Sequence, residues 1–316
     1  DRGWPMRMGW GWTMHYRKLG RTGVIVSEVG FGGNRLGEAY AGDDHWVDLV
    51  RHAADLGVTL FDTAEAYGWG RSEEVLGKAF RNRSDVVIAT KMCRVRETGE
   101  HEFSADRMME TAEGSLRRLQ RETIDIYQLH SPSREALERF DWAEGMDRLK
   151  AQGKIRLTAV AVSTEADALW LMTQGLVDVL QITYNIFHTV PEEALFAAAV
   201  DSGVGLFCRM PLARGVLTGK FRPGDAVAAG HRALLDGERV YENIGRAEAL
   251  RSIADGYEGG MPRMALHFAL TPVAVSAIIP GARTREQVEE NVAASNGCGL
   301  PRDVRSAILD AKRDWS

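Results

Sequence analysis

The feature that most constrains the fold is an alternation of short apolar runs with longer amphipathic runs along most of the chain. The apolar runs are rich in β-branched residues, as in VTLFD, DVVIATK and IRLTAVAVS. Strands that are buried on both faces of a parallel sheet have this composition. Eight such strand–helix units follow an N-terminal hairpin, which predicts an α/β protein with a single (β/α)8 TIM barrel.

The expected elements follow from apolar periodicity and from Gly, Pro and Asp at the ends of the runs. Two short strands flank the turn Gly20–Gly23, and a further strand leads into Gly32 and Gly33. The other strands are expected at 58–62, 85–91, 124–130, 155–163, 177–183, 204–210 and 275–281. Helices are expected at 43–57, 72–80, 104–120, 141–153, 165–175, 191–203, 245–256, 261–270, 284–295 and 301–315.

Composition excludes several classes of protein. The chain has 316 residues, 45% hydrophobic and 26% charged, with a formal net charge of −5. This mild acidity gives no footprint for nucleic acid or an anionic membrane, and no apolar run approaches the roughly 18 residues that span a bilayer. The three cysteines, Cys93, Cys208 and Cys298, are far apart, which favours free thiols in a reducing, cytoplasmic compartment. Cys208 lies in an apolar run and is expected to be buried.

Two segments depart from the alternation. Residues 1–15 form an arm with three tryptophans and no initiator methionine, which we interpret as a tag remnant or a mis-called start rather than a signal peptide. The barrel is expected to occupy 16–316. Residues 211–239 are rich in Gly and Arg with weak periodicity, and loops of this length inside a compact domain are usually functional.

Titratable residues stand at the ends of three consecutive predicted strands. Asp62, Lys91 and His130 end these strands, and Tyr67 lies on the loop just after the first. In a (β/α)8 barrel the carboxyl ends of the strands meet at one mouth, where the chemistry takes place. Each residue alone has an ordinary reading, such as a helix cap or a solvated charge. Four titratable groups at one mouth predict a catalytic site.

The chemistry of these four groups fits together. A phenol can deliver a proton, and a nearby ammonium favours the phenolate. A carboxylate beside the ammonium keeps it charged, and a histidine can orient a carbonyl oxygen. The sequence contains no metal-ligand cluster, GxSxG or P-loop motif, so the acid lacks a partner unless a cofactor supplies a hydride.

With these four residues, the chain resembles the aldo-keto reductase family. The resemblance rests on FDTAEAYGWGRSEEVLGKAF, VVIATK, IDIYQLH, QITYNIF, PLARGVLTGKF and IIPGARTREQVEENVAA, which occur in order from Tyr16 onward. It implies that Tyr67 is the proton donor, that Lys91 and Asp62 form its pKa-lowering pair, and that His130 orients the carbonyl. It also implies NADPH/NADP+ as the cofactor and a small carbonyl compound as the substrate.

The resemblance further implies a set of cofactor contacts around the barrel mouth. Gly33 and Asn34 would lie near the nicotinamide ribose with Asp62, and Ser163 and Gln181 would hold the carboxamide. The long loop would cover the nicotinamide and pyrophosphate, and the last barrel loop and helix would receive the adenosine. The residues of these two groups are Arg209, Pro211, Leu212, Gly215 and Lys220, then Gly281, Arg283, Gln287, Glu290 and Asn291.

Several interpretations stay open at the level of sequence. Gln287 has capping-box spacing from Thr284, so it either caps the last barrel helix, contacts the cofactor, or does both. Many relatives carry Ser-Asn where this chain has Ser163-Thr164, and an aromatic where it has Arg209. Arg209 either stacks on the nicotinamide or binds phosphate. Trp69 is either a wall of the substrate pocket or a packed surface residue.

Three functions remain under consideration. The first is an NADPH-dependent reductase of aldehydes or ketones, including sugars. The second is a non-catalytic, nicotinamide-binding regulatory subunit like the potassium-channel beta subunits. The third is an aldolase that forms a Schiff base on Lys91. Arg283, in the loop before the Thr284 cap, is expected to favour the 2′-phosphate of NADPH.

Overall fold

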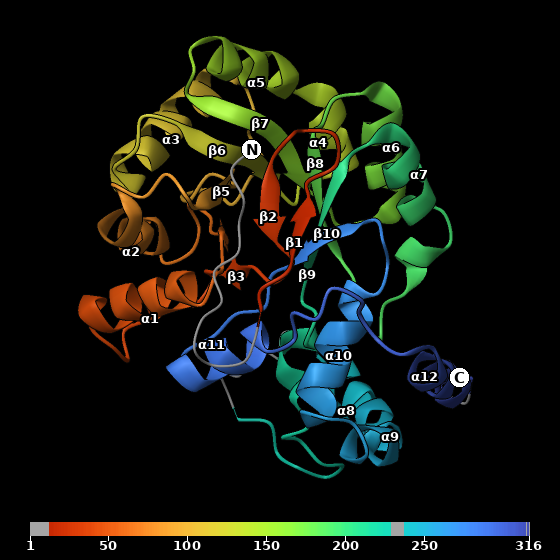
Figure 1. The fold of residues 1–316 in the computed structure, drawn as a ribbon. Coiled ribbons are helices and arrows are strands. Elements are labelled where there is room, and N and C mark those ends of the chain that lie inside the picture. The colour runs from red at the N-terminus through yellow and green to blue at the C-terminus, as the bar shows by residue number, and fades with distance from the viewer. Residues whose placement is uncertain (1–12, 229–236, 314, 316) are drawn as a thin grey trace.

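Eight parallel strands curl into a barrel that places helices on its outside. The computed structural model describes residues 13–228, 237–313 and 315. The strands follow one another around the sheet in chain order from β3 to β10 (Figure 1). Their bounds are β3 Phe31–Gly32, β4 Leu60–Asp62, β5 Val87–Met92, β6 Ile124–His130, β7 Ile155–Ala161, β8 Val179–Thr183, β9 Gly205–Arg209 and β10 Val275–Ile278. The predicted barrel is confirmed.

The barrel closes where the first strand meets the last. Two parallel bridges, Val29–Ile278 and Gly32–Gly281, join the segment of β3 to that of β10. Glycine is required here because the backbones approach closely. A Cβ on Gly32 would lie 2.8 Å from the carbonyl oxygen of Ile279, and one on Gly33 would lie 2.8 Å from that of Asp62. The glycines of GFGG therefore have a packing role at the closure.

The helices surround the sheet and mostly match the predicted segments. The α-helices are α1 Asp43–Asp55, α2 Arg71–Phe80, α3 Ala105–Leu119, α4 Arg134–Arg139, α5 Trp142–Ala151, α6 Glu165–Gln174, α7 Leu195–Ser202, α8 Arg239–Ala249, α9 Arg251–Asp255, α10 Gly260–Leu270, α11 Arg285–Val292 and α12 Arg302–Lys312. Two short 3-10 helices are η1 Val190–Glu192 and η2 Ala213–Thr218.

Three local predictions were wrong or incomplete. The helix expected at 191–203 is split into η1 and α7, and the helix expected at 245–256 is divided between α8 and α9. Helix α4 was not predicted, although the side chain of Ser133 caps its N-terminus by accepting a hydrogen bond from the backbone N–H of Ala136. Propensity alone cannot detect such breaks, because packing decides where a helix ends.

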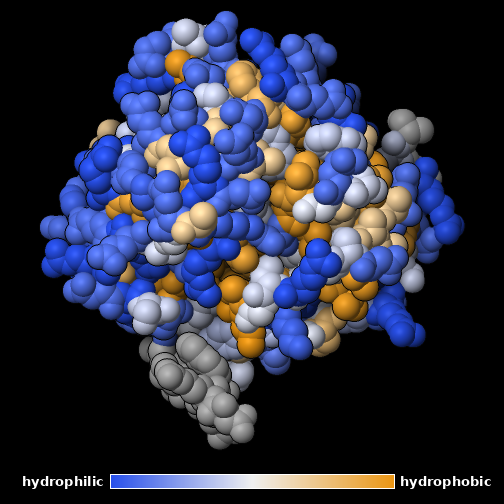
Figure 2. Space-filling model, turned by 90° about the horizontal axis from the view of Figure 1, so that it is seen from above, coloured by the Kyte–Doolittle hydropathy of each residue, from blue (hydrophilic) through white to orange (hydrophobic). Residues whose placement is uncertain are grey.

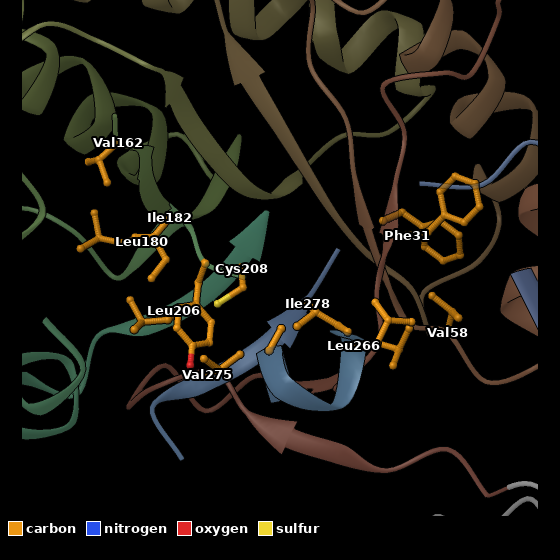
Figure 3. Close-up of a cluster of buried hydrophobic side chains, with 14 of the residues drawn as sticks. Phe31, Val58, Val162, Leu180, Ile182, Leu206, Cys208, Leu266, Val275 and Ile278 are labelled. Atoms are coloured by element: carbon orange, nitrogen blue, oxygen red, sulfur yellow. The ribbon is translucent and has the colours of Figure 1, made fainter. Parts of the chain in front are cut away.

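Two apolar cores lie on opposite faces of the sheet. The inner core fills the barrel with residues from successive strands, including Leu60, Ala89, Ile126, Val179 and Phe207. The outer core lies between the strands and the helices, where Cys208 packs near Ile182 and Leu206 (Figure 3). Cys208 is fully buried, as predicted.

The N-terminal hairpin seals one end of the barrel. Its strands, β1 Tyr16–Lys18 and β2 Ile25–Ser27, pair antiparallel and lie across the barrel in Figure 1. Leu19 and Val26 of this hairpin belong to the inner core, together with Leu60 and Ile126. The hairpin therefore plugs the end from which the strands start, and the strands' carboxyl ends form the other end.

The remaining expectations concern the arm and the surface. Residues 1–12 of the N-terminal arm and residues 229–236 of the long loop lie outside the described residues. In the part of the chain that is described, no helix combines the length and the apolar character needed to cross a bilayer. Hydrophilic side chains predominate on the face in Figure 2, with hydrophobic ones in small groups between them.

Candidate active site

A polar layer lies directly above the apolar inner core of the barrel. Side chains two residues apart on a strand point to the same face, so Asp62 follows Leu60, Lys91 follows Ala89, and Gln128 and His130 follow Ile126. The inner face of the barrel thus changes from apolar to polar toward the carboxyl ends of the strands. The structure brings together the four predicted residues Asp62, Tyr67, Lys91 and His130 at this end.

Asp62 and Lys91 form a buried ion pair at the base of this layer. Lys91 is 0% exposed, and its Nζ donates to Asp62 Oδ2 at 2.7 Å and to the carbonyl oxygen of Thr63 at 2.7 Å. Burial alone lowers the pKa of Lys91, but the Asp62 carboxylate, together with Tyr67, raises it above its ordinary value. The amine is therefore a fixed ammonium.

Asp62 is held by two side-chain amides as well as by Lys91. Its Oδ1 accepts hydrogen bonds from the side-chain amides of Gln128 at 3.0 Å and Gln181 at 2.8 Å. A buried carboxylate is stable only when it is paired and its lone pairs are hydrogen-bonded, and the two amides supply those bonds. Gln128 was missed at the level of sequence. Its signal was present, because it is a polar residue at the two-residue spacing that links Ile126 to His130.

Tyr67 faces both the ammonium and the imidazole. The Lys91 Nζ lies 5.0 Å from the centroid of the Tyr67 ring, and the rings of Tyr67 and His130 meet edge to face with centroids 5.7 Å apart. The loop that carries Tyr67 is tightly folded: its N–H donates to Ala64, and its carbonyl accepts from the N–H of Ser72. A phenol and an imidazole thus meet at one point above a buried cation.

His130 is neutral in this environment. Burial, and then the positive charges of Lys91, Arg209 and Arg94, lower the pKa of His130 to about 3. Its Nδ1 lies 3.0 Å from the Sγ of Cys93. A neutral imidazole carries one N–H and one acceptor nitrogen, so at ordinary pH His130 can donate one hydrogen bond without bringing a positive charge.

Backbone strain gathers around the same point. Among the described residues other than glycine, Trp69, Ser131 and Met210 adopt positive φ and follow closely on Tyr67, His130 and Arg209, whereas Gln120 does so as the C-cap of α3. Ala213 and Arg214, in the loop after β9, also adopt positive φ. Such conformations are costly for residues with a Cβ and tend to cluster at functional sites. None of these positions is a glycine, so no residue type in the sequence indicated them.

Arg209 is anchored across the strand ends rather than extended toward the rim. Its guanidinium donates to Thr183 Oγ1 at 3.2 Å, to Ser131 Oγ at 3.3 Å and to the carbonyl oxygen of Val162 at 2.9 Å. Burial lowers the pKa of Arg209, whereas the nearby Tyr67 and Asp62 oppose that shift. This second cation therefore faces the same point as Lys91.

Ser163 and Gln181, the two residues expected to hold the carboxamide, lie in different environments. Ser163 is exposed at the end of β7, while Gln181 is 2% exposed with its Nε2 bound to Asp62. Thr164, the departure from the common Ser-Asn pair, is the N-cap of α6 and accepts a hydrogen bond from Asp167 N. Position 164 therefore serves the helix, which leaves Ser163 as the free polar side chain of this pair to face a ligand.

The last barrel loop is rigidly braced. Gln287 N donates to Thr284 Oγ1 at 3.3 Å, so Thr284 caps α11, while Gln287 Oε1 accepts from Arg283 N, one residue before the cap, at 2.8 Å. Asn291 donates to the carbonyl oxygen of Gly281 at 3.4 Å. Glu290 is exposed on α11. Gln287 and Asn291 thus hold the shape of the loop that carries Arg283.

Basic side chains from three separate segments gather on this side of the mouth. Arg283 lies 3.4 Å from the Glu38 carboxylate and stacks over the Tyr40 ring, and Glu38 also pairs with Arg35. Burial, and then the charges of Arg283 and Arg35, lower the pKa of Lys220. Arg35 and Arg283 thus share one carboxylate, and Lys220 lies close enough to feel both of their charges. Basic side chains gathered in this way suit an anionic ligand.

The four residues share the mouth of a (β/α)8 barrel, which is where enzymes of this fold hold their active sites. A profile of the aldo/keto reductase family matches residues 28–311. The chain belongs to this family.

Its relatives include enzymes and a channel subunit. The chain is 32% identical to L-galactose dehydrogenase of Arabidopsis thaliana, covering 88% of this chain and 87% of that protein. It is 30% identical to a probable voltage-gated potassium channel subunit beta of Oryza sativa (89% and 91% covered) and to NADH-specific methylglyoxal reductase of Escherichia coli (88% and 92% covered). In structure it resembles the holo form of an aldo-keto reductase from Bacillus halodurans, with a TM-score of 0.80, 27% identity, and 94% and 96% of the two chains covered.

Proposed function

We propose that this protein is a nicotinamide-dependent oxidoreductase that reduces an aldehyde or ketone to the alcohol, with Tyr67 as the proton donor. The observation that carries the proposal is the buried ammonium of Lys91 beneath the Tyr67 ring. An ammonium held by Asp62 stabilises the negative charge that develops on the phenolic oxygen as its proton leaves. Without an acid to activate, a charged lysine at 0% exposure would be a costly feature.

Each residue of the site has a separate role toward the carbonyl group of the substrate. Tyr67 gives a proton to the carbonyl oxygen as charge develops there. His130 is neutral and donates a hydrogen bond that orients the same oxygen. Lys91 and Asp62 stay buried and keep their charges, because Asp62 is held by two amides as well as by Lys91. Reduction of a small carbonyl substrate needs only this proton donor, this orienting group and a hydride.

The mouth of the barrel fits a dinucleotide cofactor. When bound, such a cofactor supplies the hydride. Ser163 and Gln181 would hold its carboxamide, Gly33 and Asn34 its ribose, and the cations Lys220 and Arg283 its phosphates. The fit rests on the guanidiniums of Arg35 and Arg283, which share the Glu38 carboxylate, and on the nearness of Lys220, whose pKa is lowered by burial and by their charges. Arg209, tied to the strand ends, is suited to the nicotinamide end rather than to the pyrophosphate.

We further propose NADPH as the preferred form. Arg283 precedes the N-terminus of α11, and both a guanidinium and free helix amides favour a phosphate. Glu286, which the sequence suggested as a repelling charge, is exposed and bonds its own helix N-terminus, which lowers its pKa. The carboxylate that opposes a phosphate is instead Glu38. The relative named as NADH-specific makes this choice a matter for measurement.

The two alternatives fare differently. A Schiff-base aldolase requires a neutral amine as the nucleophile, whereas Lys91 is a buried ammonium bound to Asp62 with a raised pKa. The regulatory-subunit alternative gains support from the similarity to a channel beta subunit. It differs from the reductase in its outcome, since a purely regulatory chain would bind the cofactor without turnover.

The test is a panel of aldehydes, ketones and sugars assayed with NADPH and NADH, followed by Tyr67→Phe. The phenol acts in the transition state, so the variant is expected to lose at least about a hundredfold in kcat while cofactor affinity stays within about twofold. Tyr127→Phe is the matched control, because Tyr127 is a buried tyrosine that bonds Thr111 outside the site. Wild-type kcat in Tyr67→Phe would remove the phenol from the mechanism, and a wild type that binds NADPH but turns over nothing on the panel would favour the regulatory subunit.

A further inference from the structure

Cys93 occupies an unusual place between the two groups that face the substrate. It is 4% exposed, and its Sγ lies 3.0 Å from His130 Nδ1. The same sulfur accepts a hydrogen bond from the backbone N–H of Ala66 at 3.3 Å, the residue just before Tyr67. The backbone carbonyl of Cys93 is held by Arg107 at 3.1 Å. One thiol thus touches both the tyrosine loop and the histidine.

We propose that Cys93 is a positioning residue that fixes the tautomer of His130, its S–H donating to Nδ1 so that the ring proton stays on Nε2 and points to the carbonyl oxygen of the substrate. The inference rests on the proposed function for the role of His130. The hydrogen bond itself involves only groups of this chain.

The hydrogen-bond count at the sulfur favours this direction. The alternative acceptor for the thiol proton is the carbonyl oxygen of Lys91, 3.6 Å away, which already accepts from the N–H of Glu65 at 3.2 Å. If His130 donated instead, the sulfur would accept two N–H groups, although thioether and thiol sulfur are weak acceptors. Donation from the thiol to the closer Nδ1 leaves the sulfur a single N–H to accept, from Ala66, and leaves the Lys91 carbonyl oxygen its bond from Glu65.

The protonation states agree with that geometry. Burial raises the pKa of the Cys93 thiol to about 12, with the carboxylates of Glu65 and Glu73 adding to the shift against the opposing hydrogen bond from Ala66 and the charge of Lys91. The thiol therefore keeps its proton at ordinary pH. His130 is neutral and has one nitrogen free to accept. A protonated thiol beside a neutral imidazole leaves Nδ1 as the acceptor and Nε2 as the donor.

The variants separate the hydrogen bond from simple packing. Cys93→Ala removes the donor, and Cys93→Ser restores an O–H at the same position. Cys208→Ala is the matched control, because it removes the same atoms from an equally buried thiol in the outer core (Figure 3). Thermal melts of all three check that each variant is folded.

The first measurement is the two-bond 1H–15N spectrum of the histidine rings in the cofactor-free protein, with the His130 signals assigned by their loss in His130→Asn. The expected wild-type pattern is a single Nε2–H tautomer. Cys93→Ala should show a mixture of tautomers, while Cys93→Ser and Cys208→Ala keep the wild-type pattern. A wild-type Nδ1–H tautomer, or an unchanged pattern in Cys93→Ala, would overturn the proposal.

The second measurement is turnover on the best substrate of the panel. Loss of the correct tautomer should lower kcat roughly tenfold in Cys93→Ala with little change in cofactor affinity, and Cys93→Ser should recover most of it. Equal losses in Cys93→Ala and Cys93→Ser would show a packing effect and contradict the proposal. Because the tautomer is read without substrate or cofactor, its outcome stands apart from the proposed reductase activity, which Tyr67→Phe tests.

Discussion

At the scale of the residue, the site depends on charges that are held by neighbours rather than exposed to water. Asp62 and Lys91 are 3% and 0% exposed, yet each finds its counter-charge and further hydrogen bonds. Their residue types and strand-end positions were sufficient to predict that they would meet. Gln128, Gln181 and Cys93 received their structural roles only from the fold, because a buried amide or thiol in a strand carries no pattern that reveals its partner.

The Asp62–Lys91 pair yields a prediction about stability. Asp62→Asn leaves the Lys91 ammonium buried without a counter-charge, so we expect a loss of about 3–5 kcal/mol in the free energy of unfolding. The double variant Asp62→Asn/Lys91→Met contains no buried charge at this place and should recover part of that loss. Urea denaturation of both variants, with Lys91→Met alone to complete the cycle, measures the coupling. If the losses in unfolding free energy of the two single variants simply added up in the double variant, the prediction of a coupled pair would be contradicted.

At the scale of the element, the strands were easier to predict than the helices. Apolar, β-branched runs placed all eight barrel strands, because strands buried on both faces need such runs. The helices were less well bounded. The run PEEALFAAAVDSG reads as one helix, but Pro191 lies in the short 3-10 helix η1, Val190–Glu192, and a separate α7 follows. Helix ends depend on caps and on packing that periodicity does not report.

Two loops from opposite ends of the chain create the expected cofactor preference. Arg283, before α11, pairs with Glu38 from the loop before α1, and its side chain is 43% exposed. This juxtaposition was invisible in the sequence, since the residues lie far apart along the chain. In the proposed complex, Glu38 competes with the 2′-phosphate of NADPH for the same guanidinium.

The pair gives two variants with opposite expected effects. Arg283→Ala should weaken NADPH about tenfold and barely change NADH, because a charge-assisted contact to phosphate is worth about 1.5–3 kcal/mol and this arginine is partly solvated. Glu38→Gln should tighten NADPH by up to about fivefold, since an exposed ion pair contributes at most about 1 kcal/mol. Glu286→Gln, which alters an exposed carboxylate on the neighbouring helix, is the control. Fluorescence titration gives the affinities, and equal changes for the two cofactors would contradict the assignment.

At the scale of the whole molecule, the barrel couples its closure to the site. The strand that closes on β10 continues into Gly33, whose N–H donates to the carbonyl oxygen of Asp62 at 2.7 Å. Closure therefore fixes one flank of the ion pair that holds Lys91. The number of strand–helix units predicted a closed barrel, and GFGG was visible as a glycine-rich stretch. The sequence did not reveal that these glycines are needed at the closure between the β3 and β10 segments, because the clash that requires them exists only once the first and last strands meet.

The need for glycine at this closure can be tested by comparison with a glycine elsewhere in the chain. Gly32→Ala would place a Cβ 2.8 Å from the carbonyl oxygen of Ile279, so backbone must shift, and we expect a loss of about 1–3 kcal/mol in the free energy of unfolding, as for other overpacked sites. Gly245→Ala is the matched control, since Gly245 lies inside α8 with nothing within 4 Å of an added Cβ. It should instead gain about 0.5–1 kcal/mol from helix propensity. Because the closure borders Asp62, Gly32→Ala should also lower kcat, whereas Gly245→Ala should not. Urea denaturation and steady-state kinetics on both variants measure this, and effects of the same sign on stability would show that closure does not require glycine at position 32.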